Sequence, residues 1–366
     1  MTRLGPDIEE RRRAFQLPIE AVAHFSGLES QRLLAIEAGQ IVPSTWELAV
    51  IADALACDPT ELLQEGARDP RRSVARFRAG EAVKGLSGTD LRLLARGAEA
   101  GRILAHLKER LGEEVSKVAS SRRVCAPSSR REPWEDGYEL GSNARTVLAP
   151  AGAIESVQHL LEEGGIHVAE VRFEAHIEAA SLYEVGASPV ILLNVGATRL
   201  AHPLARRAIL AHELGHLLHD GGERDVTVVT RENDSSAIEQ RANGFAPSFI
   251  APRELVIPAA ISKRRDPKEL LLHLAETWGL SFEGAAWHAK NLRLLDPLVA
   301  ESLAMGPKPR FRAEFEHRLR RTSPDQFEIE AEATELSTGL LSETAIVAFA
   351  EGVISRERAA EILSLR

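Results

Sequence analysis

Apolar residues recur at three- and four-residue spacing along most of the chain, the spacing of helices that each bury one face. The pattern predicts four or five short helices between residues 7 and 65, broken by turn signals such as Gly27. A longer amphipathic stretch follows from Ser87 to Lys117, interrupted at Gly101. We expect this helix to cover its neighbours, and a dimerising coiled coil, giving a homodimer, is the alternative.

The pattern changes at about residue 118, where Ser, Arg, Pro and Gly replace the apolar spacing and predict a linker to about residue 145. A helix is predicted next at Ile154–Glu163, and the last 66 residues are mostly helical, with a helix–turn–helix pattern at Ala345–Leu363 that we expect to pack on the rest. Between these segments the sequence predicts strands at His167–Phe173, Glu178–Tyr183 and Pro189–Val195, and helices at Pro203–His219 and Ser236–Ile250.

Composition narrows the class of protein. A chain of 366 residues with 44% apolar and 27% charged residues is globular and long enough for several domains. It contains no apolar run of about 18 residues, which excludes a membrane span, and only two cysteines, Cys57 and Cys125, which fits a reducing cytoplasm. The net charge of −9 argues against non-specific nucleic-acid binding by the whole chain. The predicted fold class is α+β and mainly helical.

The most informative motif is His212-Glu213-Leu214-Gly215-His216, inside one of the predicted helices. Two histidines four residues apart lie on one helical face, so that their imidazoles can bind one ion. Zinc is the expected metal, and Glu213 can reach a metal-bound water as a general base without being a ligand. Gly215 costs the helix about 1 kcal/mol relative to alanine, which predicts close approach of another backbone.

A third ligand is expected on another helix downstream, and Glu239 is the best candidate. The donor to the oxyanion is left open among His219, Arg206, Arg207 and Tyr183. The apolar strand Pro189–Val195 either presents an edge to an extended substrate or is internal to the sheet. Cys125 either reaches the zinc as a thiolate or, as we favour, is an inert thiol.

Residues Arg206–His216 followed by Glu239–Ala246 resemble the ImmA/IrrE metallopeptidases, which have a gluzincin-like active site. The resemblance covers about residues 150–300, and Trp278-Gly279-Leu280-Ser281 is similar to the small winged-helix-like portion of that family. It implies zinc bound by His212, His216 and Glu239, with Glu213 as general base, and cleavage of a transcriptional repressor, often of the XRE type. The family often has a further histidine four residues after its second ligand, whereas here His219 comes three residues after.

Residues 8–63 resemble an XRE-family helix-turn-helix, from Ala21-Val22-Ala23 through Gly27-Leu28-Glu29 to Pro43-Ser44 and Pro59. The resemblance implies a recognition helix at about Glu29–Ala38, with Gln31 and Arg32 nearest the major groove. Residues 1–65 hold five arginines against eleven acidic residues, a net charge of −6, which weakens binding to phosphates. DNA binding and a protein-interaction role therefore both stay open for this unit.

The leading hypothesis is a cytoplasmic zinc metallopeptidase that cleaves one specific protein, most plausibly an XRE-type repressor, and so controls stress-response or mobile-element genes. The alternative is a DNA-binding transcriptional regulator whose peptidase-like domain is a sensor or dimerisation platform. The predicted domains are a helix-turn-helix (1–65), a helical connector (66–117), a flexible linker (118–145), the metallopeptidase (146–300) and a helical C-terminal region (301–366).

Overall fold

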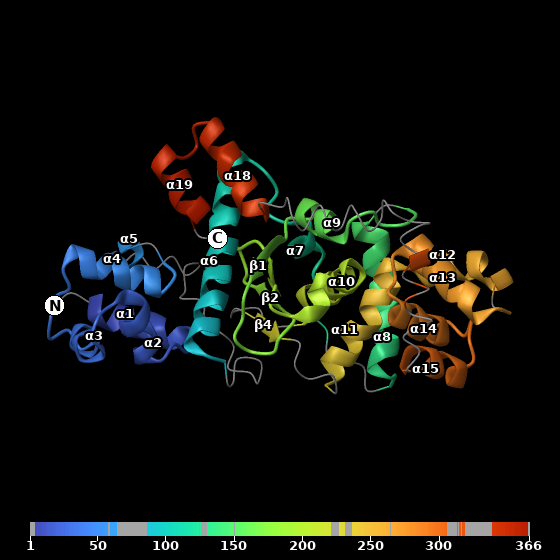
Figure 1. Ribbon diagram of the computed structural model, residues 1–366. Coiled ribbons are helices and arrows are strands. Elements are labelled where there is room, and N and C mark those ends of the chain that lie inside the picture. Colours follow the sequence, from blue (N-terminus) through green and yellow to red (C-terminus); the bar gives the residue numbers. More distant parts are fainter. Residues whose placement is uncertain are drawn as a thin grey trace.

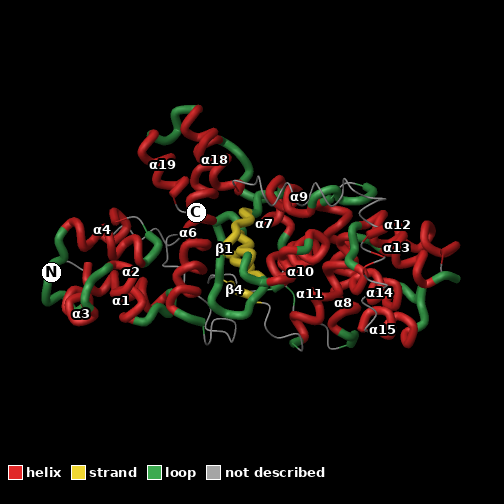
Figure 2. Tube along the Cα trace, viewed as in Figure 1, coloured by secondary structure: helices red, strands yellow, loops and turns green. Residues whose placement is uncertain are grey.

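The computed structural model describes residues 4–57, 59–63, 86–123, 125, 130–149, 151–220, 227–230, 236–263, 265–305, 313, 315, 317–318 and 339–364. Helices account for most of these residues, and a small sheet lies near the middle of the molecule (Figure 1, Figure 2). The predicted class, α+β and mainly helical, is therefore confirmed. None of the described helices is long and apolar enough to cross a membrane.

Five short helices form an N-terminal unit, as the apolar spacing predicted. Their inward side chains, among them Leu33 and Ile51, are fully buried in a shared core. A capping box starts the fourth helix, since the Ser44 hydroxyl accepts from the Glu47 backbone N–H and the Glu47 carboxylate accepts from that of Ser44. The helices are α1 (Leu4–Ala14), α2 (Ile19–Ser26), α3 (Ser30–Glu37), α4 (Thr45–Ala54) and α5 (Pro59–Leu63).

The long helix α6 (Gly88–Leu111) lies between the N-terminal unit and the sheet (Figure 1). It runs unbroken through Gly101, where a Cβ would lie only 2.5 Å from the Ser188 carbonyl oxygen. Gly101 therefore marks a close contact between helix and sheet rather than the interruption suggested by the sequence. The part of the predicted helical connector that forms α6 therefore belongs to the hydrophobic core. Residues 66–85 of the predicted connector lie outside the described residues.

The sheet has four strands in the order β1-β3-β2-β4. β1 pairs parallel with β3, and β2 pairs antiparallel with both β3 and β4. Three strands fall where the sequence predicted them, and β4 was not predicted. β3 is internal, which decides between the two alternatives left open for Pro189–Val195, and β1 and β4 are the edges of the described sheet. The strands are β1 (His167–Val171), β2 (Ala179–Tyr183), β3 (Val190–Asn194) and β4 (Thr227–Thr230).

The helices α10 (Pro203–His219) and α9 (Val157–Glu163) contact the other face of the sheet, and α11 (Ala237–Ile250) and α8 (Pro133–Leu148) pack behind α10. α8 corrects the predicted flexible linker 118–145, as does the short helix α7 (Lys117–Ser121), which contacts α10. Proline opens α8, and its glycines permit close packing on α11: a Cβ at Gly141 would lie 2.5 Å from the Phe245 carbonyl oxygen. A composition typical of a linker thus belongs to a tightly packed helix.

The C-terminal residues form two groups of helices. One group packs beyond α11. Its last helix, α15, spans residue 300, so the domain boundary predicted after residue 300 falls inside a helix. The other is a helical pair that lies on α6 and β1, at the top of Figure 1, as expected for the predicted helix–turn–helix pattern. The first group contains α12 (Arg253–Ala260), α13 (Pro267–Trp278), α14 (Phe282–Asn291) and α15 (Pro297–Met305), and the second contains α18 (Gly339–Ala350) and α19 (Arg356–Ser364).

Candidate metal centre

The helix α10 carries two histidines one turn apart, and it is buried along most of its length between the sheet and α11. Pro203 lies in its first turn, where the missing N–H removes no helical hydrogen bond. At Gly215 a Cβ would lie 3.1 Å from the Phe245 ring, so a side chain rather than the predicted backbone makes the close approach. This packing brings α11 within reach of His212 and His216.

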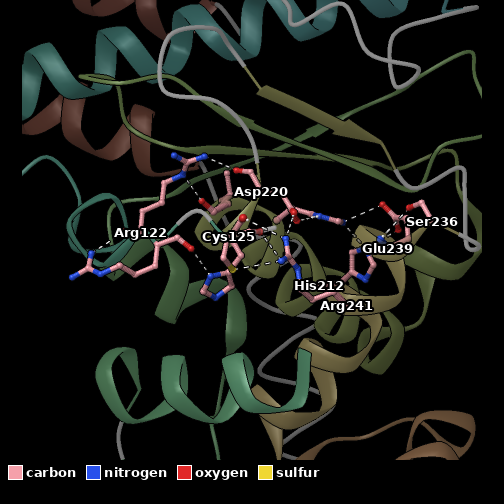
Figure 3. A network of polar contacts seen from close by, with 11 residues as sticks. Arg122, Cys125, His212, Asp220, Ser236, Glu239 and Arg241 are labelled. Carbon is pink, nitrogen blue, oxygen red and sulfur yellow. Dashed lines mark hydrogen bonds and ion pairs between the residues drawn. The ribbon is translucent and has the colours of Figure 1, made fainter. Parts of the chain in front are cut away.

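The helix α11 supplies the third group, as the sequence predicted. Ser236 caps α11 by accepting a hydrogen bond from the Glu239 backbone N–H at 3.2 Å, which places Glu239 in the first turn. One carboxylate oxygen of Glu239 lies 3.2 Å from His212 Nε2 and the other lies 3.2 Å from His216 Nε2. The two Nε2 atoms are 3.0 Å apart (Figure 3 shows the surrounding network). The three predicted ligands therefore converge on one point.

The spacing of these atoms fits a small metal ion. Tetrahedral zinc with bonds of about 2.0–2.1 Å holds its ligand atoms about 3.3–3.4 Å apart. The separations of 3.0–3.2 Å observed between the two imidazoles and the carboxylate are close to that value. Across the described residues, His212, His216 and Glu239 are the group of three side chains with metal-ligand atoms this close together.

The charges at the centre also fit a divalent cation. Glu213, Asp220 and Glu239 are buried carboxylates, and one buried guanidinium, that of Arg241, accompanies them. With neutral imidazoles these groups carry a net charge of −2, which is costly to bury without a cation. The site accordingly favours positive charge: although burial opposes protonation, hydrogen bonds to Asp220 and Glu239 raise the pKa of His216 to about 10.

The pKa of the Glu239 carboxylate is shifted in the opposite direction, downwards. Burial by itself would raise its pKa, but the hydrogen bonds from His212 and His216 lower the pKa of Glu239 to about 2. Glu213 is completely buried beside His212, and its negative charge contributes to the raised pKa of His216. It is thus close to the centre without belonging to the group of metal-ligand atoms, as expected for a general base rather than a ligand.

Asp220 is a functional residue that the sequence reasoning missed. One of its carboxylate oxygens lies 2.7 Å from His216 Nδ1, a bond that fixes the ring with Nε2 turned towards Glu239. Asp220 stands four residues after His216, at the position where the resemblance led us to look for another histidine. The i,i+4 spacing of a carboxylate and a histidine at the end of a helix was the available signal.

Residues 161–288 match the family model Peptidase_M78, the IrrE N-terminal-like domain. No curated protein and no solved structure matches the chain. The matched range runs from the last turn of α9 to α14 and contains all the residues of the centre. A metallopeptidase-type activity is therefore supported for this part of the chain, and the peptidase part of the predicted resemblance is confirmed.

The XRE-type identity of residues 8–63 stays a prediction, because the family match begins at residue 161. The predicted recognition helix corresponds to α3, on which Gln31 and Arg32 are both exposed. The Arg32 guanidinium forms an ion pair with the Glu47 carboxylate at the start of α4. The two predicted DNA contacts are thus on the surface, and one of them is held by an acidic neighbour.

Each of the candidate oxyanion donors has a partner of its own. Arg206 pairs with Glu170 at 2.9 Å, and Arg207 donates to the backbone carbonyls of residues 154 and 155. His219 Nδ1 lies 2.9 Å from the Arg123 carbonyl oxygen, and the Tyr183 ring lies 3.9 Å beneath the Arg122 guanidinium. Cys125 lies beside Arg241, with its sulfur 3.5 Å from the guanidinium, and does not belong to the group of metal-ligand atoms.

Proposed function

We propose that this protein is a zinc-dependent metalloendopeptidase in which His212, His216 and Glu239 hold the metal and Glu213 is the general base. The observation that carries the proposal is the convergence of two imidazole nitrogens and a carboxylate, all within 3.2 Å of one another, beside a further buried carboxylate. The match of residues 161–288 to a peptidase family supports the same chemistry.

A zinc ion held by these residues would act as a Lewis acid and lower the pKa of a bound water towards about 7. Glu213 would accept a proton from the attacking water and pass it to the leaving amine of the cleaved peptide. Asp220 keeps the His216 ring in one orientation while charge develops at the centre. Burial of these groups excludes bulk water and so strengthens the electrostatic interactions among them.

An extended peptide substrate has a suitable partner in the edge strand β4. Because β3 is internal, β-addition, which the sequence left open for Pro189–Val195, is assigned to β4. This strand pairs with β2, is an edge of the described sheet and follows the metal-binding helix in the chain. Backbone pairing would give affinity without demanding particular side chains. A narrow preference for one protein would then have to come from contacts elsewhere on the molecule.

The proposed substrate is an XRE-type transcriptional repressor, and its cleavage would control stress-response or mobile-element genes. This part of the proposal rests on the family resemblance. The test is incubation of a repressor encoded beside the protein with zinc-loaded wild type and with Glu213→Gln. We expect fragments with wild type and a rate about 10²–10⁴-fold lower with Glu213→Gln, at unchanged zinc content. Equal cleavage by both proteins would overturn the assignment of Glu213.

The second candidate is a transcriptional regulator that binds DNA through its N-terminal unit and uses the peptidase-like domain as a sensor or dimerisation platform. The exposure of Gln31 and Arg32 on α3 supports this candidate. However, three large apolar side chains of α3, α4 and the loop between them are exposed as well: Leu34 is 48% exposed, Val42 79% and Trp46 61%. An exposed tryptophan in an acidic unit favours a protein partner over DNA.

Titrations with duplex DNA and with the repressor, each at two salt concentrations, separate these roles. DNA binding that weakens steeply with salt and is unchanged in Glu213→Gln, without any cleavage of the repressor, would favour the regulator. Binding of the repressor that is lost in Trp46→Ala would favour protein recognition by the N-terminal unit.

A further inference from the structure

Arg241 is 2% exposed and belongs to the network of polar contacts around the metal centre (Figure 3). Its Nη2 donates to the free oxygen of the Asp220 carboxylate, the one that does not contact His216. Its Nη1 donates to the Cys125 carbonyl at 2.7 Å. The guanidinium thus connects a carboxylate on α10 with a backbone segment that precedes α8.

Three residues of that segment, Arg122, Arg123 and Cys125, close the C-terminal end of the metal-binding helix. The Arg123 backbone N–H donates to the Leu218 carbonyl at 2.9 Å, and the Cys125 N–H donates to the His219 carbonyl at 3.1 Å. Arg122 donates to the Leu217 carbonyl at 2.9 Å. The last carbonyls of a helix have no partners within it, so this segment satisfies groups that water would otherwise solvate.

We propose that Arg241 is a positioning residue of the metal centre. It holds the Asp220 carboxylate in the one orientation that binds His216 Nδ1, and Cys125 holds Arg241 in turn. The inference rests on the proposed zinc site. A carboxylate bonded at only one oxygen can rotate, whereas Asp220 is bonded at both. Arginine suits the task because its planar fork reaches Asp220 and the Cys125 carbonyl at once, which the single ammonium of lysine does not.

The test measures zinc binding to the full-length protein by competition with a chromophoric chelator, together with the visible spectrum of the cobalt-substituted protein. The variants are Arg241→Gln, Arg241→Lys, Asp220→Asn and the double variant Asp220→Asn/Arg241→Gln. Arg206→Gln is the matched control, since Arg206 is a buried arginine of the metal-binding helix that pairs with Glu170, away from the centre. Unfolding of the metal-free proteins is followed in parallel.

We expect Arg241→Gln and Asp220→Asn each to weaken zinc binding by about 10–100-fold and to change the cobalt spectrum. The double variant should be no weaker than the weaker single variant, because both residues act through His216. Arg206→Gln should bind zinc within about threefold of wild type, and Arg241→Lys should fall between wild type and Arg241→Gln. If Arg241→Gln does not fold, Arg241→Lys provides the same comparison.

Two results would overturn the inference while leaving the proposed function intact. One is wild-type zinc affinity and an unchanged cobalt spectrum in Arg241→Gln and Arg241→Lys. The other is full additivity of the two losses in the double variant, which would mean that Arg241 acts independently of Asp220. Failure of the wild-type protein to bind zinc would instead overturn the proposed function itself.

Discussion

In the N-terminal unit two buried carboxylates, those of Glu37 and Glu47, are each paired with an arginine, whereas the metal centre contains three buried carboxylates and one arginine. In the N-terminal unit Glu37 binds Arg12 through both oxygens at 2.8 and 2.9 Å, and Glu47 binds Arg32. The hydrogen bonds from Arg32 and Ser44 lower the pKa of Glu47 to about 2. These pairs neutralise themselves locally, so the unit's net charge of −6 comes from its remaining acidic residues.

At the centre the excess negative charge is buried instead of solvated. Glu213, Asp220 and Glu239 are almost inaccessible to solvent, and so is Arg241, the guanidinium that accompanies them. The net charge of a region therefore does not by itself indicate a ligand site. An acidic surface is satisfied by water and dissolved ions, whereas a buried negative excess has to be balanced by a bound cation.

The largest expected effect is the loss of metal on removal of one ligand. If a zinc-binding free energy of about 12 kcal/mol is shared among three ligands, His212→Ala should weaken zinc binding on the order of 10³-fold. Elemental analysis after dialysis should then find zinc at background level, against about one ion per wild-type chain.

The matched control for that experiment lies in the N-terminal unit. Glu37→Gln also removes one member of a buried pair, since Glu37 binds Arg12, but it should leave the zinc content unchanged. Full zinc occupancy in His212→Ala would contradict the assignment of the centre, and loss of zinc in Glu37→Gln would contradict the independence of the two regions.

The next largest effect is a loss of stability in acid that should spare the N-terminal unit. Burial lowers the pKa of His167 and of His288 from 6.5 to about 4. Because each folded-state pKa is depressed, the unfolded chain binds protons more readily, and stability that is complete above pH 6.5 is lost as the pH falls towards 4. Each histidine should contribute about 3 kcal/mol to this loss.

The C-terminal helices provide a specific readout of the same effect. His167 Nδ1 accepts a hydrogen bond from the Leu341 backbone N–H at 3.4 Å, at the start of α18. Protonation turns this acceptor into a donor, so the protection of α18 amides from hydrogen exchange, corrected for the intrinsic rate at each pH, should fall between pH 6.5 and 4 before that of α3 amides does. His24, the histidine among the described residues of the N-terminal unit, is exposed. An equal loss of protection in α3 and α18 would refute the expected difference between the two regions.

The motif of the centre could be predicted from the sequence because its ligands lie on two regular helices. A spacing of four residues fixes the relation of His212 to His216, and a serine cap places Glu239 in the first turn of the next helix. The arginine that supports the centre could not be predicted in this way. Its contacts to Asp220 and to Cys125 join positions 21 and 116 residues apart.

The segment 118–145 shows why composition misled the prediction of the fold. Serine, arginine, proline and glycine are typical of linkers, yet here Pro133 lies at the start of α8 and Gly137 and Gly141 allow α8 to pack against the backbone of α11. The same residue types occur in flexible linkers and in close helix–helix contacts. Only the presence of a partner helix, here α11, distinguishes the second case from the first. β4 was missed for a related reason, since it is a strand of four residues that depends on pairing with β2.

The smallest expected effect on stability comes from the exposed tryptophan of the N-terminal unit, and it is informative for that reason. Trp46 is 61% exposed in the first turn of α4, so Trp46→Ala should change the free energy of unfolding by less than about 0.5 kcal/mol and leave zinc binding unaltered. Wild-type stability combined with weaker binding of a repressor would place protein recognition on this surface, remote from the centre. Ala49→Ser, an exposed substitution on the same helix, serves as the control, and a large loss of stability in Trp46→Ala would mean that the side chain supports the fold instead.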